Sequence, residues 1–253
     1  MGKFDGILFV TDLDGTLIQS DGTISKENSD AIRYFQSEGG IFTVATGRYP
    51  DFLQQYEDSF KVNGCVIGLN GNIIYDTYND KTLYIKRIDR NKLNPDLMHI
   101  VSTYSDAIRF ITINDDVESY NYEGTLYRDV CKCFIVTTGE KEALKIKKDL
   151  IEKYGDIYAF ERSWYVGLEF YDKNSGKGTC IDYFVKNICP SVKKVICVGD
   201  YENDESMLKR ADIGYAIKDS TIALMGVADR ITGVDNDNHA IAWIINELEK
   251  EVL

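Results

Sequence analysis

An apolar run near the N-terminus that ends on two carboxylates constrains this chain most. Residues 7–10 (ILFV) have the length and β-branched character of a strand that is buried on both faces, as strands of parallel sheets are. Asp12 and Asp14 follow, two residues apart, directly before Gly15. Residues two apart in extended backbone point the same way, so we expect both carboxylates to face one pocket beyond the strand's carboxyl end. The alternative is an ordinary acidic turn that closes the strand.

The composition is that of a folded protein with a core, and the net charge argues against nucleic acid as a partner. The 253 residues are 44% hydrophobic and 28% charged, enough for one large domain or two of ordinary size. The formal charge of −12 opposes binding to a phosphate backbone, although local cations can still hold a small phosphate ester. Six cysteines without zinc-site spacing are expected to be reduced thiols. Because we find no signal-peptide segment and no 18-residue apolar run, we expect a cytoplasmic protein without membrane contact.

Strand and helix patterns alternate at both ends of the chain. After the first strand, helices are predicted at 25–38 and 50–60 and strands at 41–45 and 65–69. The same alternation resumes near residue 177, with helices at 178–187, 204–210 and 238–248 and strands at 195–198 and 213–216. This order is typical of a parallel sheet with right-handed crossovers, so we predict an α/β fold with a Rossmann-like core.

The middle of the chain has a different pattern. From about residue 72 to 171, short alternating β segments surround two predicted helices at 94–104 and 141–154. This order of short strands and two helices indicates an α+β module of domain size. We therefore predict a core formed by residues 1–80 and 173–253, with an α+β domain of residues 81–172 inserted between its two parts.

Polar side chains follow four of the predicted core strands. They are Asp12 and Asp14, Thr46, Asn70, and Asp200 with Asp204, while Lys177 opens a helix. Each has an ordinary alternative, such as a turn residue, a helix cap or a solvated lysine. Together they fit phosphoryl transfer: carboxylates suit Mg²⁺, one carboxylate can attack phosphorus, and a second can act as acid and base. Thr46 and Lys177 can bind phosphoryl oxygens.

Four segments occur in the order of the motifs of the haloacid dehalogenase superfamily. They are residues 12–17 (DLDGTL), 45–48 (ATGR), 176–178 (GKG) and 199–208 (GDYENDESML). The sequence more narrowly resembles the Cof-type hydrolases, whose large α/β cap lies between the second and third motifs. The predicted insertion occupies that place, so the resemblance spans essentially the whole chain.

The resemblance implies a role for each matched residue. Asp12 would be the nucleophile and a Mg²⁺ ligand, Asp14 the general acid and base with its backbone carbonyl on the metal, and Asp200 the acidic metal ligand. Lys177 would orient Asp12 and the phosphate, and Asp204 would support the metal site or its loop. The substrate-binding set would comprise Thr46, Gly47, Arg48, Asn70, Gly71, Lys177 and Asn203.

The chain departs from the family pattern at two positions. Asn72 stands where the family often has alanine, and Asp219-Ser220 stand where it often has Asn-Ala. Neither change is expected to touch the core chemistry, although the second leaves no assigned role for position 219.

The resemblance implies a Mg²⁺-dependent phosphatase that acts on small phosphate monoesters, such as sugar phosphates, through an aspartyl-phosphate. The alternatives are a phosphomutase or other phosphotransferase, or a non-catalytic phosphate-binding regulatory protein. We expect a small-molecule phosphate ester as the partner and a monomer or small homo-oligomer. The polar segment 114–123, with Tyr122, could close over substrate, and Arg48 or Arg128 could meet a sugar hydroxyl or a second anion.

Overall fold

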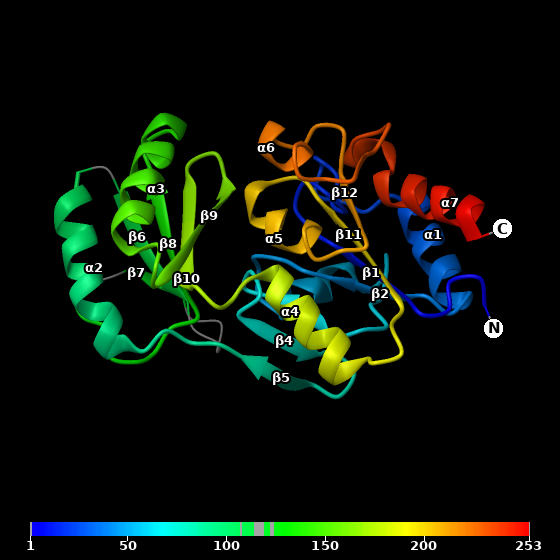
Figure 1. Cartoon of the computed structure of the whole chain (residues 1–253), viewed down its shortest axis with the longest axis horizontal. Helices are drawn as coiled ribbons and strands as arrows, with labels where there is room; N and C mark the ends of the chain where they lie inside the picture. The colour runs from blue at the N-terminus through cyan, green and yellow to red at the C-terminus, as the bar shows by residue number, and fades with distance from the viewer. Residues whose placement is uncertain (1, 107, 114–118, 122–123, 253) are drawn as a thin grey trace. The chain divides into compact units, whose positions relative to one another are not determined.

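The computed structural model describes residues 2–106, 108–113, 119–121 and 124–252 (Figure 1). The chain forms two compact units. The first combines Met1–Leu83 with Lys177–Leu253, and the second is Tyr84–Gly176, inserted between those two segments. Within the described residues, no helix combines the length and the apolar character that crossing a membrane requires.

The core of the first unit is a five-stranded parallel sheet with the order β13-β12-β11-β1-β2. Its strands are β1 (Ile7–Thr11), β2 (Ile41–Val44), β11 (Lys194–Gly199), β12 (Ile213–Ala216) and β13 (Arg230–Ile231). All five residues of β1 are buried, because helices cover both faces of this inner strand (Figure 1). The predicted α/β class with a parallel-sheet core is thus confirmed.

Two long helices cover one face of this sheet. They are α1 (Lys26–Ser37) and α7 (Ala240–Val252), which lie side by side (Figure 1). Their apolar side chains, including Ile32, Phe35 and Ile244, share a buried cluster with Phe9 and Phe42 of the sheet. Ser25 caps α1 as expected, since its hydroxyl accepts from the backbone N–H of Asn28.

The other helices of this unit are short. They are α4 (Lys177–Tyr183), which continues into the π-helical turn η2 (Phe184–Ile188), α5 (Glu205–Leu208), α6 (Ile222–Met225), and the 3₁₀ turns η3 (Glu202–Asp204) and η4 (Asn236–Asn238). The predicted helix at 50–60 is a 3₁₀ helix, η1 (Pro50–Tyr56). Helix α5 packs against β11 and β12, and α4 packs against α5. These two helices therefore support the segment that follows β11.

The third predicted strand does not extend the parallel sheet. β3 (Val66–Gly68) pairs antiparallel with β4 (Ile73–Asp76), and β5 (Lys81–Ile85) completes a separate three-stranded sheet. A single parallel bridge between Ala45 and Ile67 joins it to the end of β2. The reason is a tight reversal at Leu69, Asn70 and Gly71, all of which have positive φ.

The inserted unit is an antiparallel sheet covered by two helices. The strands run in the order β7 (Ser119–Asn121), β6 (Ile108–Ile113), β8 (Lys132–Thr137), β10 (Gly167–Asp172) and β9 (Tyr158–Trp164). Alternate residues of β8, β9 and β10 form a buried cluster with apolar residues of α2 (Arg90–Tyr104) and α3 (Glu140–Tyr154). The period-two alternation therefore places both helices on one face of the sheet.

Candidate active site

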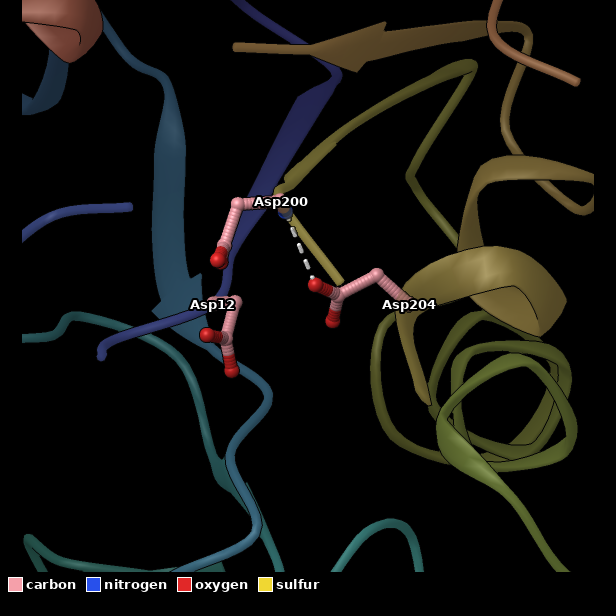
Figure 2. A group of neighbouring side chains, drawn as sticks. All are labelled: Asp12, Asp200 and Asp204. Carbon is pink, nitrogen blue, oxygen red and sulfur yellow. Dashed lines mark hydrogen bonds between the residues drawn. The ribbon is translucent and has the colours of Figure 1, made fainter. Parts of the chain in front are cut away.

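Three carboxylates gather at the carboxyl ends of the neighbouring strands β1 and β11. Thr11, the last residue of β1, pairs with Val198 of β11, and the N–H of Asp12 donates to the Val198 carbonyl at 2.9 Å. This register places Asp12 next to Asp200, which directly follows β11. Asp204 approaches from the turn before α5, and one oxygen of each carboxylate lies within 4.8 Å of the others (Figure 2).

The buried side chain of Lys177 bonds to two of these carboxylates. It is the first residue of α4 and is fully buried. Its Nζ donates to Asp12 Oδ1 and to Asp204 Oδ1, each at 2.6 Å. Charge-assisted bonds of this length are strong in a buried setting, so the lysine fixes the nucleophile candidate relative to Asp204.

Asp204 uses both of its oxygens inside the protein. Oδ1 accepts from Lys177. Oδ2 accepts from the backbone N–H of Asp200 at 3.0 Å (Figure 2) and from that of Tyr201 at 3.2 Å. A Cβ at position 199 would come within 2.4 Å of the Asp204 side chain, so only glycine lets this carboxylate sit so close. Asp204 therefore holds the loop after β11 and orients Lys177.

The carboxylate of Asp200 is fixed from the turn that follows β1. Thr16 Oγ1 donates to Asp200 Oδ1 at 2.7 Å. Gly15 adopts a φ of +80°, and a Cβ there would lie 2.7 Å from Asp200 Oδ2. The Asp-Gly-Thr segment thus leaves space for Asp200 and donates one hydrogen bond to it.

The electrostatics of the cluster are those of crowded, dehydrated anions. Burial raises the pKa of Asp12 well above its usual range, Asp204 and Asp200 add to this, and Lys177 opposes it. Loss of solvent raises the pKa of Asp200 to about 7, with a further contribution from Asp204 and an opposing one from the Thr16 hydrogen bond. Burial by itself would lower the pKa of Lys177, but Asp12 and Asp204 outweigh it, so the net pKa is raised and the ammonium stays charged.

The carboxylate oxygens of this cluster suit a hard divalent cation as ligands. Among the described residues, the second carboxylate oxygens of Asp12 and Asp200 have no hydrogen-bond partner, whereas both oxygens of Asp204 do. Mg²⁺ prefers carboxylate oxygens and commonly uses one or two from the protein. Asp12 and Asp200 are therefore the side chains suited to hold it, with Asp204 behind them.

Asp14 is not part of this three-carboxylate cluster, and the extended backbone from which we predicted that it faces the same pocket as Asp12 is absent. β1 ends at Thr11, and the Leu13 carbonyl accepts from the N–H groups of residues 16, 17 and 18, so the chain turns at once. The half-exposed Asp14 side chain pairs with Arg48 instead: Arg48 Nε donates to Oδ2 at 2.7 Å and Nη2 donates to Oδ1 at 2.8 Å.

The other predicted substrate-binding residues come from three segments that are joined by hydrogen bonds beside the end of β2. Thr46 is buried, and its carbonyl accepts from the Asn70 N–H at 2.9 Å. Asn203 Nδ2 in turn donates to Asn70 Oδ1 at 3.2 Å. A Cβ at Gly47 would lie 3.2 Å from the same Asn70 oxygen, and Gly71 has a φ of +86°. These residues therefore come together, as their places after β2, β3 and β11 predicted.

Two residues of this region escaped the sequence reasoning. Thr16 belongs to the first motif, and its position after Asp-Gly was the available signal for its bond to Asp200. Asn72 is fully buried and donates to the Leu69 carbonyl at 2.6 Å, so this departure from the family pattern helps to hold the reversal beside Asn70. This role of Asn72 depends on its contact with Leu69, which the sequence alone does not reveal.

Two predictions about the insertion remain predictions. Arg128 is an exposed residue of the inserted unit. Tyr122, and with it residues 114–118 and 123 of the segment expected to close over substrate, lie outside the described residues.

The chain matches the family model of haloacid dehalogenase-like hydrolases over residues 9–124 and 109–245. A protein of Buchnera aphidicola named "putative phosphatase" is 26% identical to it, over 95% of this chain and 96% of the relative. Phosphatase YwpJ of Bacillus subtilis is 23% identical, over 95% and 99% of the two chains. The structure of the HAD subclass IIB sugar phosphatase BT4131 superposes with a TM-score of 0.78 at 16% identity, covering 97% of this chain and 99% of that one.

Proposed function

The chain belongs to the haloacid dehalogenase-like hydrolases, and from that membership we propose that it is a Mg²⁺-dependent phosphatase of small phosphate monoesters. One observation carries the proposal. A fully buried lysine holds Asp12 by one carboxylate oxygen, and the other oxygen, beside Asp200 at the strand end, has no hydrogen-bond partner within the described part of the chain. A carboxylate with one restrained and one available oxygen is suited to nucleophilic attack in a fixed direction.

In the proposed reaction, Asp12 attacks the phosphorus atom and the ester bond breaks, which gives an aspartyl-phosphate. Lys177 keeps Asp12 in place and offsets negative charge next to the reacting groups. Asp14 gives its proton to the leaving ester oxygen and later takes a proton from the water that hydrolyses the intermediate. Formation and hydrolysis of the aspartyl-phosphate therefore both need Asp12 and Asp14. The attacking group is Asp12 in the first step and water in the second.

The phosphoryl group would bind at the Thr46–Gly47 segment that follows β2. Thr46 and the backbone around Gly47 lie next to Asn70, whose amide is oriented by Asn203. Hydroxyl and amide donors in a preorganised loop stabilise the charge that spreads over phosphoryl oxygens during transfer. We assign Thr46, Gly47, Asn70, Gly71 and Asn203 to this task.

We propose Asp12, Asp200 and the backbone carbonyl of Asp14 as the ligands of Mg²⁺, with Asp204 in support. One Asp12 oxygen would bind the cation, and the other would attack phosphorus. When bound, the cation would offset the charge of the crowded carboxylates and of the phosphoryl oxygens. Asp200, whose pKa is raised to about 7 without a cation, would bind as the ionised carboxylate.

We propose phosphorylated sugars or related metabolites as substrates, and the inserted unit as the part of the chain that selects among them. The names of the relatives support a phosphatase, and one structure with the same fold is that of a sugar phosphatase. Since a shared fold does not fix the substrate, the choice within this class rests on experiment.

The experiment is phosphate release from a panel of sugar phosphates, nucleotides and p-nitrophenyl phosphate, with Mg²⁺ and with EDTA. Asp12→Asn is the matched variant, because it keeps the size of the side chain and removes the nucleophile. Mg²⁺-dependent turnover that is lost in Asp12→Asn is the expected result. Absence of turnover in folded wild type, or full turnover in Asp12→Asn, would refute the phosphatase proposal and favour the phosphotransferase or regulatory alternatives.

A further inference from the structure

The contact between Arg48 and Asp14 is more constrained than a half-exposed ion pair requires. The guanidinium meets the carboxylate with two parallel hydrogen bonds, of 2.7 and 2.8 Å. Side-chain exposure is 45% for Arg48 and 49% for Asp14, and exposed pairs contribute little to stability because solvent screens them. The geometry is therefore better explained by what it does to the position of Asp14 than by fold stability.

Arg48 is itself held at three points. Its N–H donates to Thr46 Oγ1 at 3.1 Å, and its carbonyl accepts from the Leu69 N–H at 2.9 Å. Its guanidinium carbon lies 3.8 Å from the centre of the Phe52 ring, a close cation–π contact. The backbone is thus fixed to the phosphate-loop residues, and the planar fork is fixed by an aromatic face on η1.

A planar fork held in this way determines the plane of the carboxylate that it binds. Asp14 follows a turn rather than a strand, so its backbone neighbours do not direct the side chain toward Asp12. A bidentate guanidinium can supply that direction, whereas the point charge of a lysine cannot. Arg48 is placed to do so from a fixed loop of the same unit.

We propose that Arg48 is a positioning residue for the general acid and base Asp14, rather than a direct contact of the substrate. The inference rests on the proposed phosphatase function. In the first half-reaction the Asp12–phosphorus bond forms, the phosphorus–oxygen ester bond breaks, and the Asp14 proton passes to the leaving oxygen. Both Asp14 oxygens accept from Arg48 in the structure. When Asp14 acts as the acid, the oxygen that carries the proton gives up its bond to Arg48 and the other oxygen keeps its bond, so one of the two hydrogen bonds still restrains the carboxyl group during the transfer.

The test compares two esters that differ in their need for a proton. An alkyl phosphate from the panel leaves as a poor alkoxide, and p-nitrophenyl phosphate leaves as a stable phenolate. We expect Arg48→Ala to lower kcat/KM for the alkyl ester by roughly 100-fold, the lower end of what general acid catalysis supplies, and to change it only a few-fold for the aryl ester. Arg48→Lys should not restore the alkyl activity, and Phe52→Leu should show the same selective loss at smaller size.

A double variant separates positioning from an independent role. If Arg48 acts through Asp14, then Asp14→Asn with Arg48→Ala should be no slower on the alkyl ester than Asp14→Asn alone. Equal loss of kcat/KM on both esters with a raised KM would instead make Arg48 a substrate contact and overturn the inference. If Arg48→Ala keeps the wild-type kcat/KM on the alkyl ester, the positioning role of Arg48 is also refuted, but the proposed phosphatase function is not. Wild type that hydrolyses neither ester would refute the proposed function and this inference together.

Discussion

Replacing Lys177 by methionine should destabilise the first unit by about 3–5 kcal/mol near pH 8, the usual cost of removing one partner of a buried ion pair. Methionine has a similar length, so the change removes charge and hydrogen bonds more than volume. It leaves Asp12 and Asp204, each bonded to the lysine at 2.6 Å, without their cation in a site where both are buried. The loss should therefore exceed that of an ordinary surface substitution.

The destabilisation should depend on pH with a definite sign. The pKa of Lys177 is raised in the folded wild type, so its contribution is complete at all pH values below its unfolded pKa of about 10.5. In the variant the pKa of Asp12, already raised by burial, loses the opposing effect of the lysine and rises further. The folded variant then binds more protons than the unfolded chain above about pH 4, so its stability falls as pH increases. The loss relative to wild type should be markedly smaller at pH 5 than at pH 8.

Urea unfolding in EDTA, followed by the fluorescence of Trp243, measures this difference. Trp243 packs against the core of the first unit, and the chain's other tryptophan, Trp164, belongs to the inserted unit, so a Trp164→Phe background reports on the first unit alone. Lys26→Met, which breaks an exposed pair with Asp30 on α1, is the control and should change little. An equal loss at pH 5 and pH 8, or none at pH 8, would refute the reasoning.

Mg²⁺ binding should weaken below about pH 7, up to tenfold per pH unit, because a proton on Asp200 competes with the cation; calorimetric affinities that match at pH 6 and pH 8 would contradict this. Thr16→Val removes the hydrogen bond that lowers the Asp200 pKa, so the same curve should shift to higher pH, while Thr16→Ser should leave it in place. Gly15→Ala should lower the urea midpoint more than Gly22→Ala. Both glycines have φ near +80°, but only the Cβ at position 15 meets Asp200, at 2.7 Å, so equal effects would exclude that contact as the cause.

The sequence was most informative where strands are buried on both faces. The segments of β1, β2, β11 and β12 are continuous apolar runs, and the parallel order brings their carboxyl ends to one edge, so the pattern of residues alone predicts that Asp12, Thr46 and Asp200 lie there. β13 was missed because Arg230 and Ile231 are exposed, which leaves no apolar run to find. β3 looked like a core strand because its three residues are just as buried, yet it turns back at Leu69.

Side-chain direction was less predictable than place, and Asp14 shows the reason. The argument that residues two apart face the same way holds only while the backbone stays extended, and here the chain turns directly after Asp12. The partner that then fixes Asp14, Arg48, is 34 residues away, on a loop whose path depends on the reversal at Leu69. Lys177 bonds to Asp12, next to which it was expected, but the sequence does not reveal its complete burial, because a lysine that opens a helix is usually solvated. Motif spacing thus identifies which residues meet at a sheet edge, whereas the turn between Asp12 and Asp14 decides that one contacts the buried lysine and the other the exposed arginine.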